Sequence, residues 1–543
     1  MVTRREDLPR LRQELIARVS ESVAHNTTRS AGEILEESIF WERRRLAEDR
    51  GSPAHARDTQ FWNELQQKLR RSPNAHQLGL LKEAVNHYAG EIEGHFDPRI
   101  YTLVTRAIPP AMGMVLNAVS PLTLARRLPS LPSLDDCVTI QGEIEHLRSL
   151  REKGTVILVP THLSNLDSVV MGYALYRLGL PPFVYGAGLN LFRNRLFGFF
   201  MHNLGAYTVD RKKNDPLYKE VLKQYATLTL EFGYDNLFFP GGTRSRAGAV
   251  ERRLKLGLLG TGLSAYIQNL ARNAERPNVY IVPATISYRL VLEAETLISD
   301  FLSAVGKNRY IIEDDEFSRP RQILDFLAKL VSLDSRIHIT ISRGIDPFGN
   351  PVNDDGVSLD PQGRSIDIAR YTHVNGEPSE VDDRDSEYTK EAAERISDAF
   401  FRDNVLESTH VTARAVFDAL RARNQKMGVF QLIRTHGGED EVPMLDLYER
   451  TERILADLSE LESKRQVRVG DSCRQPADDV VSDGLAHFSK YHTRPAAERR
   501  GDRVLGTDTS LLLYYQNRLE GYPVGVHRPV LTEDHRSLRP REF

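Results

Sequence analysis

A short apolar run followed closely by a helical pattern is the feature that most constrains this chain. Thr155–Val159 is rich in β-branched residues and is bounded by Gly154 and Pro160, which is typical of a buried strand. Apolar residues then recur at helical spacing over Ser168–Leu178, until Gly179 ends the pattern. A buried strand followed by a helix is the building unit of α/β proteins.

The same alternation continues from Cys137 to about Arg343. Because strands that alternate with helices usually lie parallel, we predict an α/β domain with a mostly parallel sheet. The further strands are expected at Phe183–Gly186, Tyr207–Val209, Asn236–Phe239, Val279–Tyr288 and Arg336–Ser342, and the further helices at Leu191–Leu204, Pro216–Phe232 and Leu254–Leu270.

Helical periodicity dominates on both sides of this domain. We expect helices at Leu8–Val23, Gln60–Tyr88, Glu387–Arg423 and Met444–Leu461. The predicted division is a helical N-terminal region over residues 1–130, the α/β domain over 131–350, a loop or linker over 351–385 and a helical C-terminal region over 386–543.

Composition excludes several classes of protein. A net charge of −3 gives no electrostatic case for a nucleic-acid partner. Two cysteines exclude a disulfide framework and a multi-cysteine zinc site, and no metal is expected. The N-terminus lacks the apolar core of a signal peptide, and no uncharged apolar run reaches the ~18 residues of a membrane span. Ala107–Ala125, the nearest to one, is either a buried helix or a membrane-surface segment. We therefore expect a cytoplasmic protein.

His162 and Asp167 lie between the first strand and its helix, where open α/β sheets bind ligands. Five residues along a helix is a rotation of about 500°, so the two side chains could not share a helical face. They can meet only if His162 lies in the loop and Asp167 in the first helical turn. His162 would then be a general base whose tautomer Asp167 fixes. The alternative is that Asp167 only caps the helix.

Arginines follow two other strands. After Asn236–Phe239 comes Gly241-Gly242-Thr243-Arg244-Ser245-Arg246. The glycines allow backbone N–H groups to turn toward an anion, and guanidinium groups bind phosphate in bidentate fashion. On an extended chain, Arg244 and Arg246 would point the same way. Arg211 also ends a strand. The alternative is a set of surface turns with solvated arginines.

In combination these clusters are more specific. The segments HLSNLD, GAYTVDR, FPGGTRSR and IVPATISY occur in that order over about Gln141–Tyr288. Their order and spacing resemble the four motif blocks of the glycerolipid acyltransferase superfamily, the His-x4-Asp acyltransferases, and most closely its glycerol-3-phosphate acyltransferase branch. The resemblance implies that a fatty acyl group moves from acyl-CoA or acyl carrier protein to the sn-1 hydroxyl of glycerol 3-phosphate, without a further cofactor.

The resemblance also implies roles for single residues. His162 and Asp167 match the catalytic pair, and Pro283 matches the fourth block, on the acyl-donor side. The residues that match the second and third blocks, which bind the phosphate acceptor, are Arg211, Gly242, Thr243, Arg244, Ser245 and Arg246. One departure is Gly241, where the family usually has glutamate.

Three questions stay open at this point. A close alternative acceptor is lysophosphatidate, and an alternative of another class is a non-catalytic protein that binds acyl-CoA or lipid. The helix predicted over Leu191–Leu204 either packs on the sheet or lies on a membrane, with Phe199 and Phe200 inserted. The expected location is therefore the cytoplasmic face of a membrane.

Overall fold

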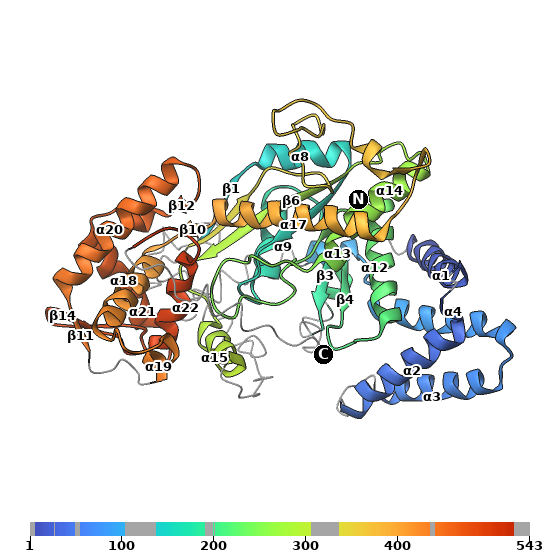
Figure 1. Ribbon diagram of the computed structural model, residues 1–543, viewed down its shortest axis with the longest axis horizontal. Helices are drawn as coiled ribbons and strands as arrows, with labels where there is room; N and C mark the ends of the chain where they lie inside the picture. Colours follow the sequence, from blue (N-terminus) through green and yellow to red (C-terminus); the bar gives the residue numbers. More distant parts are fainter. Residues whose placement is uncertain are drawn as a thin grey trace.

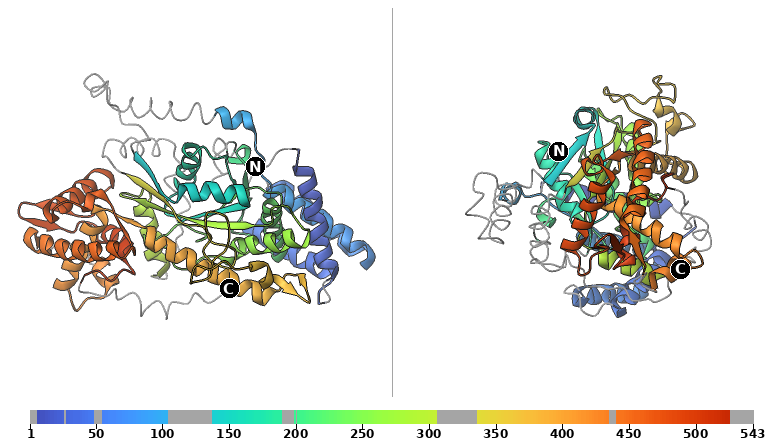
Figure 2. Two further views of the ribbon diagram at one scale, coloured as in Figure 1. Left: turned by 90° about the horizontal axis from the view of Figure 1, so that it is seen from above. Right: turned by 90° about the vertical axis from the view of Figure 1, so that its left-hand side faces the viewer.

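The computed structural model describes residues 6–25, 28–48, 55–103, 137–189, 199, 201–305, 336–434 and 440–525. A sheet with flanking helices occupies the middle of the molecule (Figure 1). The N-terminal helices lie beyond one end of this sheet and the C-terminal helices beyond the other, and the view from above agrees (Figure 2).

The central sheet has seven strands in the order β1-β7-β6-β2-β5-β3-β4. Every neighbouring pair is parallel except β6 and β7. The predicted α/β fold with a mostly parallel sheet is thus confirmed. The strands are β1 (Val138–Gly142), β2 (Thr155–Pro160), β3 (Val184–Gly188), β4 (Ala206–Val209), β5 (Asn236–Leu237), β6 (Val279–Tyr288) and β7 (Ile337–Ile341).

Helices cover both faces of the sheet, as the alternation of side chains along β2 requires. Val156 and Leu158 share a core with α8 (Ile144–Lys153) and α9 (Asp167–Arg177). Ile157 and Val159 pack into a second core. Its helical contributors are α12 (Pro216–Glu231), α13 (Leu256–Leu259), α14 (Thr261–Ala271) and α17 (Asp382–Asp403). Because both faces of β2 are buried, its sequence is almost continuously apolar.

Four helices form the described part of the N-terminal region: α1 (Leu8–His25), α2 (Ala31–Glu48), α3 (His55–Arg71) and α4 (Asn74–Ile92). They share a core with α12 (Pro216–Glu231) and with β3 and β4. The helical pattern predicted over Gln60–Tyr88 is divided between two helices, because Pro73 separates α3 from α4. Proline removes a backbone donor and ends the first helix, while apolar periodicity resumes in the second.

The C-terminal region is helical around the buried helix α18 (Ser408–Arg423). The predicted helix Glu387–Arg423 is wrong: α17 ends at Asp403, and Val405–Leu406 forms β10, which pairs with β12 (Arg468–Val469). The other elements are α15 (Ala294–Val305), α19 (Val429–Arg434), α20 (Met444–Ser463), α21 (Ala477–Tyr491), α22 (Thr509–Gln516), β8 (His373–Val374), β9 (Glu377–Pro378), β11 (Glu441–Pro443), β13 (Glu498–Arg500) and β14 (Arg503–Leu505).

Two sequence predictions concern possible membrane contact. Ala107–Ala125 lies outside the described residues, as does most of Leu191–Leu204, although Phe199 is described and is 52% exposed. Within the described ranges, no helix combines the length and apolar character needed to cross a bilayer.

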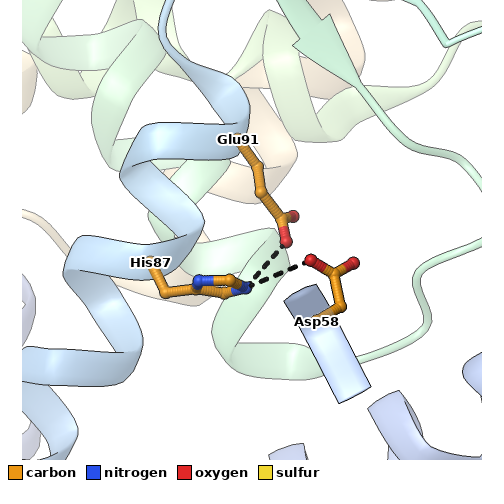
Figure 3. A group of neighbouring side chains, drawn as sticks. All are labelled: Asp58, His87 and Glu91. Atoms are coloured by element: carbon orange, nitrogen blue, oxygen red, sulfur yellow. Dashed lines mark ion pairs between the residues drawn. The ribbon is translucent and has the colours of Figure 1, made fainter. Parts of the chain in front are cut away.

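A buried ionic network joins the N-terminal helices to the loop after β4. The Lys213 ammonium lies 2.5 Å from Glu91 and 3.0 Å from Glu42. Burial raises the pKa of Glu91, but Lys213 and His87 together outweigh this and hold the pKa at about 2. The second Glu91 oxygen faces His87, which also lies near Asp58 (Figure 3). The N-terminal helices thereby fix the chain two residues beyond Arg211.

Replacing Lys213 with alanine should lower the free energy of unfolding by about 3–5 kcal/mol, because two buried carboxylates would lose their shared cation. Chemical denaturation of the full chain measures this. The neighbouring Lys212 is exposed, so Lys212→Ala should change stability by less than about 0.5 kcal/mol. If the two substitutions changed the free energy of unfolding equally, the stabilising role of the Lys213 ion pairs would be contradicted.

Candidate active site

His162 and Asp167 meet in the geometry expected from their spacing. His162 lies in the loop after β2, and Asp167 is the first residue of α9. The Nδ1 atom of His162 is 2.9 Å from the Oδ2 atom of Asp167. That oxygen also accepts the backbone N–H groups of Leu163, at 2.6 Å, and Ser164, at 2.9 Å. The Tyr288 hydroxyl donates to Oδ1 at 2.7 Å. A fully buried carboxylate is therefore held by four donors.

This arrangement selects one tautomer of His162. Because Asp167 accepts from Nδ1, the Nε2 lone pair is left to accept a proton. Burial lowers the pKa of His162 below its ordinary value, against the opposing effect of Asp167. The positive charges of Arg244 and Arg211 lower this pKa further. The ring also stacks on Phe239, with centroids 4.1 Å apart. At neutral pH the site therefore presents an oriented, uncharged base.

The glycine-containing turn after β5 packs against the His162 loop. The Ser245 N–H donates to the His162 carbonyl at 2.7 Å. Gly242 has a φ of +75°, a conformation that favours glycine, and a side chain there would meet Lys255. Thr243 is exposed in the same turn. The turn thus carries its polar groups to the edge of the sheet where His162 lies.

The arginines differ in their surroundings. Arg244 is half-buried, and its Nη1 lies 3.4 Å from Glu293. Arg211 and Arg246 are exposed. Partial desolvation by the surrounding protein, together with the charge of Arg244, lowers the pKa of Arg211. The charges of Arg244 and Arg211 both lower the pKa of His162, and the charge of Arg244 lowers that of Arg211. The three side chains are therefore near enough to interact electrostatically.

Two sequence expectations need correction or refinement here. No strand is assigned over residues 243–249, and Arg246 lies in a turn, so the extended chain on which the expected common direction of Arg244 and Arg246 rested is not found there. Alternation of side chains applies only to extended chain. Pro283 lies in β6, opposite Val159, and its carbonyl accepts the Ser342 N–H at 2.9 Å. It is part of the sheet beneath the site.

Three groups that hold the site were missed by the sequence analysis. Tyr288 was assigned only to a core strand. Glu293 is fully buried and accepts from the Ser164 hydroxyl at 2.7 Å and from the Asn165 N–H at 2.9 Å. Glu251 accepts the His162 N–H at 3.0 Å. The one local signal that could have identified Glu293 is its place directly after the apolar run Leu290-Val291-Leu292.

Among the described residues, only Asp58, His87 and Glu91 bring three potential metal ligands together (Figure 3). Asp58 already pairs with Arg45 at 2.8 Å, and Glu91 pairs with Lys213 at 2.5 Å. The two carboxylates therefore have cationic partners from the protein, and the group shares no residue with the His162 site.

The pKa of His162 should lie below its ordinary value of about 6.5 and should fall further in Asp167→Asn. The reason is that the Asp167 carboxylate favours the imidazolium. NMR titration of ¹³C-histidine-labelled full-length protein measures both values, with the His162 signal assigned by its loss in His162→Gln. A rise in Asp167→Asn would refute the electrostatic assignment.

Comparison with known proteins identifies this part of the chain. Residues 141–287 match the family model described as Acyltransferase. Glycerol-3-phosphate acyltransferase of Ectopseudomonas mendocina is 31% identical over 171 residues, which is 31% of this chain and 20% of that protein. The protein of the same name from Aeromonas hydrophila is 30% identical over 210 residues, 38% of this chain and 23% of its own length. The one from Pseudomonas syringae pv. tomato is 32% identical over 173 residues, 32% of this chain and 20% of its own length.

The matched region thus spans about a fifth of the length of these curated relatives. Their names confirm the resemblance to the glycerol-3-phosphate acyltransferase branch, and the match covers the strands and turns that carry His162, Arg211 and Arg244. Residues 141–287 therefore match the acyltransferase family, in agreement with the resemblance to the glycerolipid acyltransferase superfamily.

Proposed function

We propose that this protein transfers a fatty acyl group from a thioester, acyl-CoA or acyl carrier protein, to the sn-1 hydroxyl of glycerol 3-phosphate, as a step of phospholipid synthesis. The observation that carries the proposal is the oriented His162 imidazole, whose pKa is lowered by burial and by the charges of two guanidinium groups. The named relatives support the choice of acceptor.

In the proposed reaction, Nε2 of His162 takes the proton of the acceptor hydroxyl as its oxygen attacks the thioester carbonyl. The new C–O bond forms, the C–S bond breaks, and the departing thiolate takes the proton from the imidazolium. Asp167 holds the ring through Nδ1 and stabilises its positive charge, while Tyr288 and the two backbone N–H groups keep the carboxylate in place.

The phosphate would be held mainly by guanidinium groups. Arg211 and Arg244 supply the charge, and Arg246 is exposed in the same loop as Arg244. Gly242, Thr243 and Ser245 form the turn that positions Arg244, with the N–H groups of Gly242 and Ser245 bonded to the Phe239 and His162 carbonyls. Holding the acceptor in this way makes attack on the thioester effectively intramolecular. Pro283 would support the acyl-donor side from within β6. Association with the cytoplasmic face of a membrane belongs to the same proposal and rests on the exposed Phe199.

A thiol-release assay tests the function. Full-length protein with acyl-CoA and glycerol 3-phosphate should release free CoA, faster than with lysophosphatidate and far faster than with unphosphorylated glycerol. His162→Ala should lower kcat by at least about 100-fold, because the general base is lost. His373 is exposed and lies in another part of the sequence, so His373→Ala is the matched control.

Thiol release at the parent rate in a folded His162→Ala variant would overturn the role of the base. A preference for lysophosphatidate would replace the proposed acceptor. No release with any of these acceptors would instead favour a lipid-binding protein.

A further inference from the structure

The missing side chain at position 241 leaves a space that another residue fills. Gly241 is not among the glycines with positive φ, so its backbone would accept any L residue. A Cβ atom built there would nevertheless lie 2.6 Å from Cδ of Glu251 and 2.7 Å from each of its carboxyl oxygens. Such distances are far inside van der Waals contact. A side chain at position 241 and the Glu251 carboxyl therefore exclude each other.

Glu251 reaches this space from the far side of the same loop. The Lys255 N–H donates to the Pro240 carbonyl at 2.7 Å, which brings the end of the loop back to its beginning. A carboxyl group thus enters the space beside Gly241 from ten residues further along the chain.

The Glu251 carboxyl holds the backbone of the proposed base. Its Oε1 accepts the His162 N–H at 3.0 Å, while the Ser245 N–H binds the His162 carbonyl at 2.7 Å. The peptide groups on both sides of the His162 Cα are thus tied to the loop of residues 240–255. Because the imidazole is attached to that Cα through Cβ, these two backbone contacts help to fix where the ring lies.

The other carboxyl oxygen lies in a buried, polar setting. Oε2 of Glu251 is buried and has no hydrogen-bond partner among the described residues. Burial raises the pKa of Glu251 to about 8, and the negative charge of Asp167 adds to this, although Arg518 opposes it. At neutral pH the Glu251 carboxyl is therefore protonated in most molecules. A neutral glutamine at this position would keep both the shape and the oxygen that accepts the His162 N–H.

We propose that Glu251 is a positioning residue for His162, that its carboxyl takes the space left free by Gly241, and that any side chain at position 241 displaces it. The kinetic part of this inference rests on the proposed function, while its structural part does not. A misplacement of about 1 Å in a catalytic group can cost about 100-fold in rate, so the displacement should be measurable.

The kinetic test is a double-mutant cycle in the full chain, by thiol release with glycerol 3-phosphate. Glu251→Ala and Gly241→Ala should each lower kcat about 10-fold, with KM for the acceptor changed less than about threefold, because both act through His162 rather than on phosphate. The kcat of the double variant should lie within about threefold of that of Glu251→Ala, because both substitutions remove the same contact. Glu251→Gln should recover most of the activity.

Two control variants are provided by the same loop and the helix after it. Gly257→Ala adds a methyl group in open space, and Arg253 is exposed two residues from Glu251. Gly257→Ala and Arg253→Ala should leave kcat unchanged. The inference is overturned if Glu251→Ala keeps kcat within twofold of the parent, or if the double variant loses the product of the two single effects, about 100-fold.

A second readout does not depend on the acceptor. In NMR titrations, Glu251→Ala and Gly241→Ala should raise the His162 pKa toward its ordinary value of about 6.5, because water reaches the loosened ring. Glu251→Gln and Gly257→Ala should leave it in place. If the parent releases no thiol, the proposed function fails and this titration alone decides the inference. A His162 pKa that is the same in Glu251→Ala as in the parent would then overturn the positioning role of Glu251.

Discussion

The buried Asp167 carboxylate is the group on which the rest of this site depends. An ionised carboxylate without hydrogen bonds would be very costly to bury. Its four donors come from the loop after β2 and from Tyr288 at the end of β6. Satisfying the charge therefore requires the loop, the start of α9 and β6 to keep one arrangement. The orientation of the His162 ring follows from that requirement.

The regions on both sides of the acyltransferase domain contribute to holding this arrangement. The N-terminal helices bury Lys213 just beyond Arg211, and so fix the loop on one side of the site. On the other side, Arg289 directly follows β6 and pairs with Glu407, at the start of α18. The C-terminal helices also share a continuous core with the sheet. Their packing explains how a loop cluster can hold charged groups at fixed positions.

Local patterns predicted the parts of the fold and site that depend on neighbours in sequence. The strand Val279–Tyr288 was predicted with its observed bounds, and the meeting of His162 with Asp167 followed from a spacing of five residues. Features that depend on distant partners were missed. Val405–Leu406 becomes a strand only by pairing with a segment about sixty residues away. Glu251 lies 89 residues from His162 and is followed by two arginines, like many surface acids, so no local pattern signals their contact.

We propose that the His162 imidazole and the guanidinium groups of Arg211 and Arg244 share one phosphate-binding site. The most direct measurement is the His162 pKa, by NMR of the full-length protein, without and with saturating glycerol 3-phosphate. The positive charges of Arg244 and Arg211 lower this pKa, so a bound phosphate dianion should raise it, and the increase should disappear in an Arg211→Met/Arg244→Met variant. A His162 pKa that stays unchanged when glycerol 3-phosphate is bound would contradict the account.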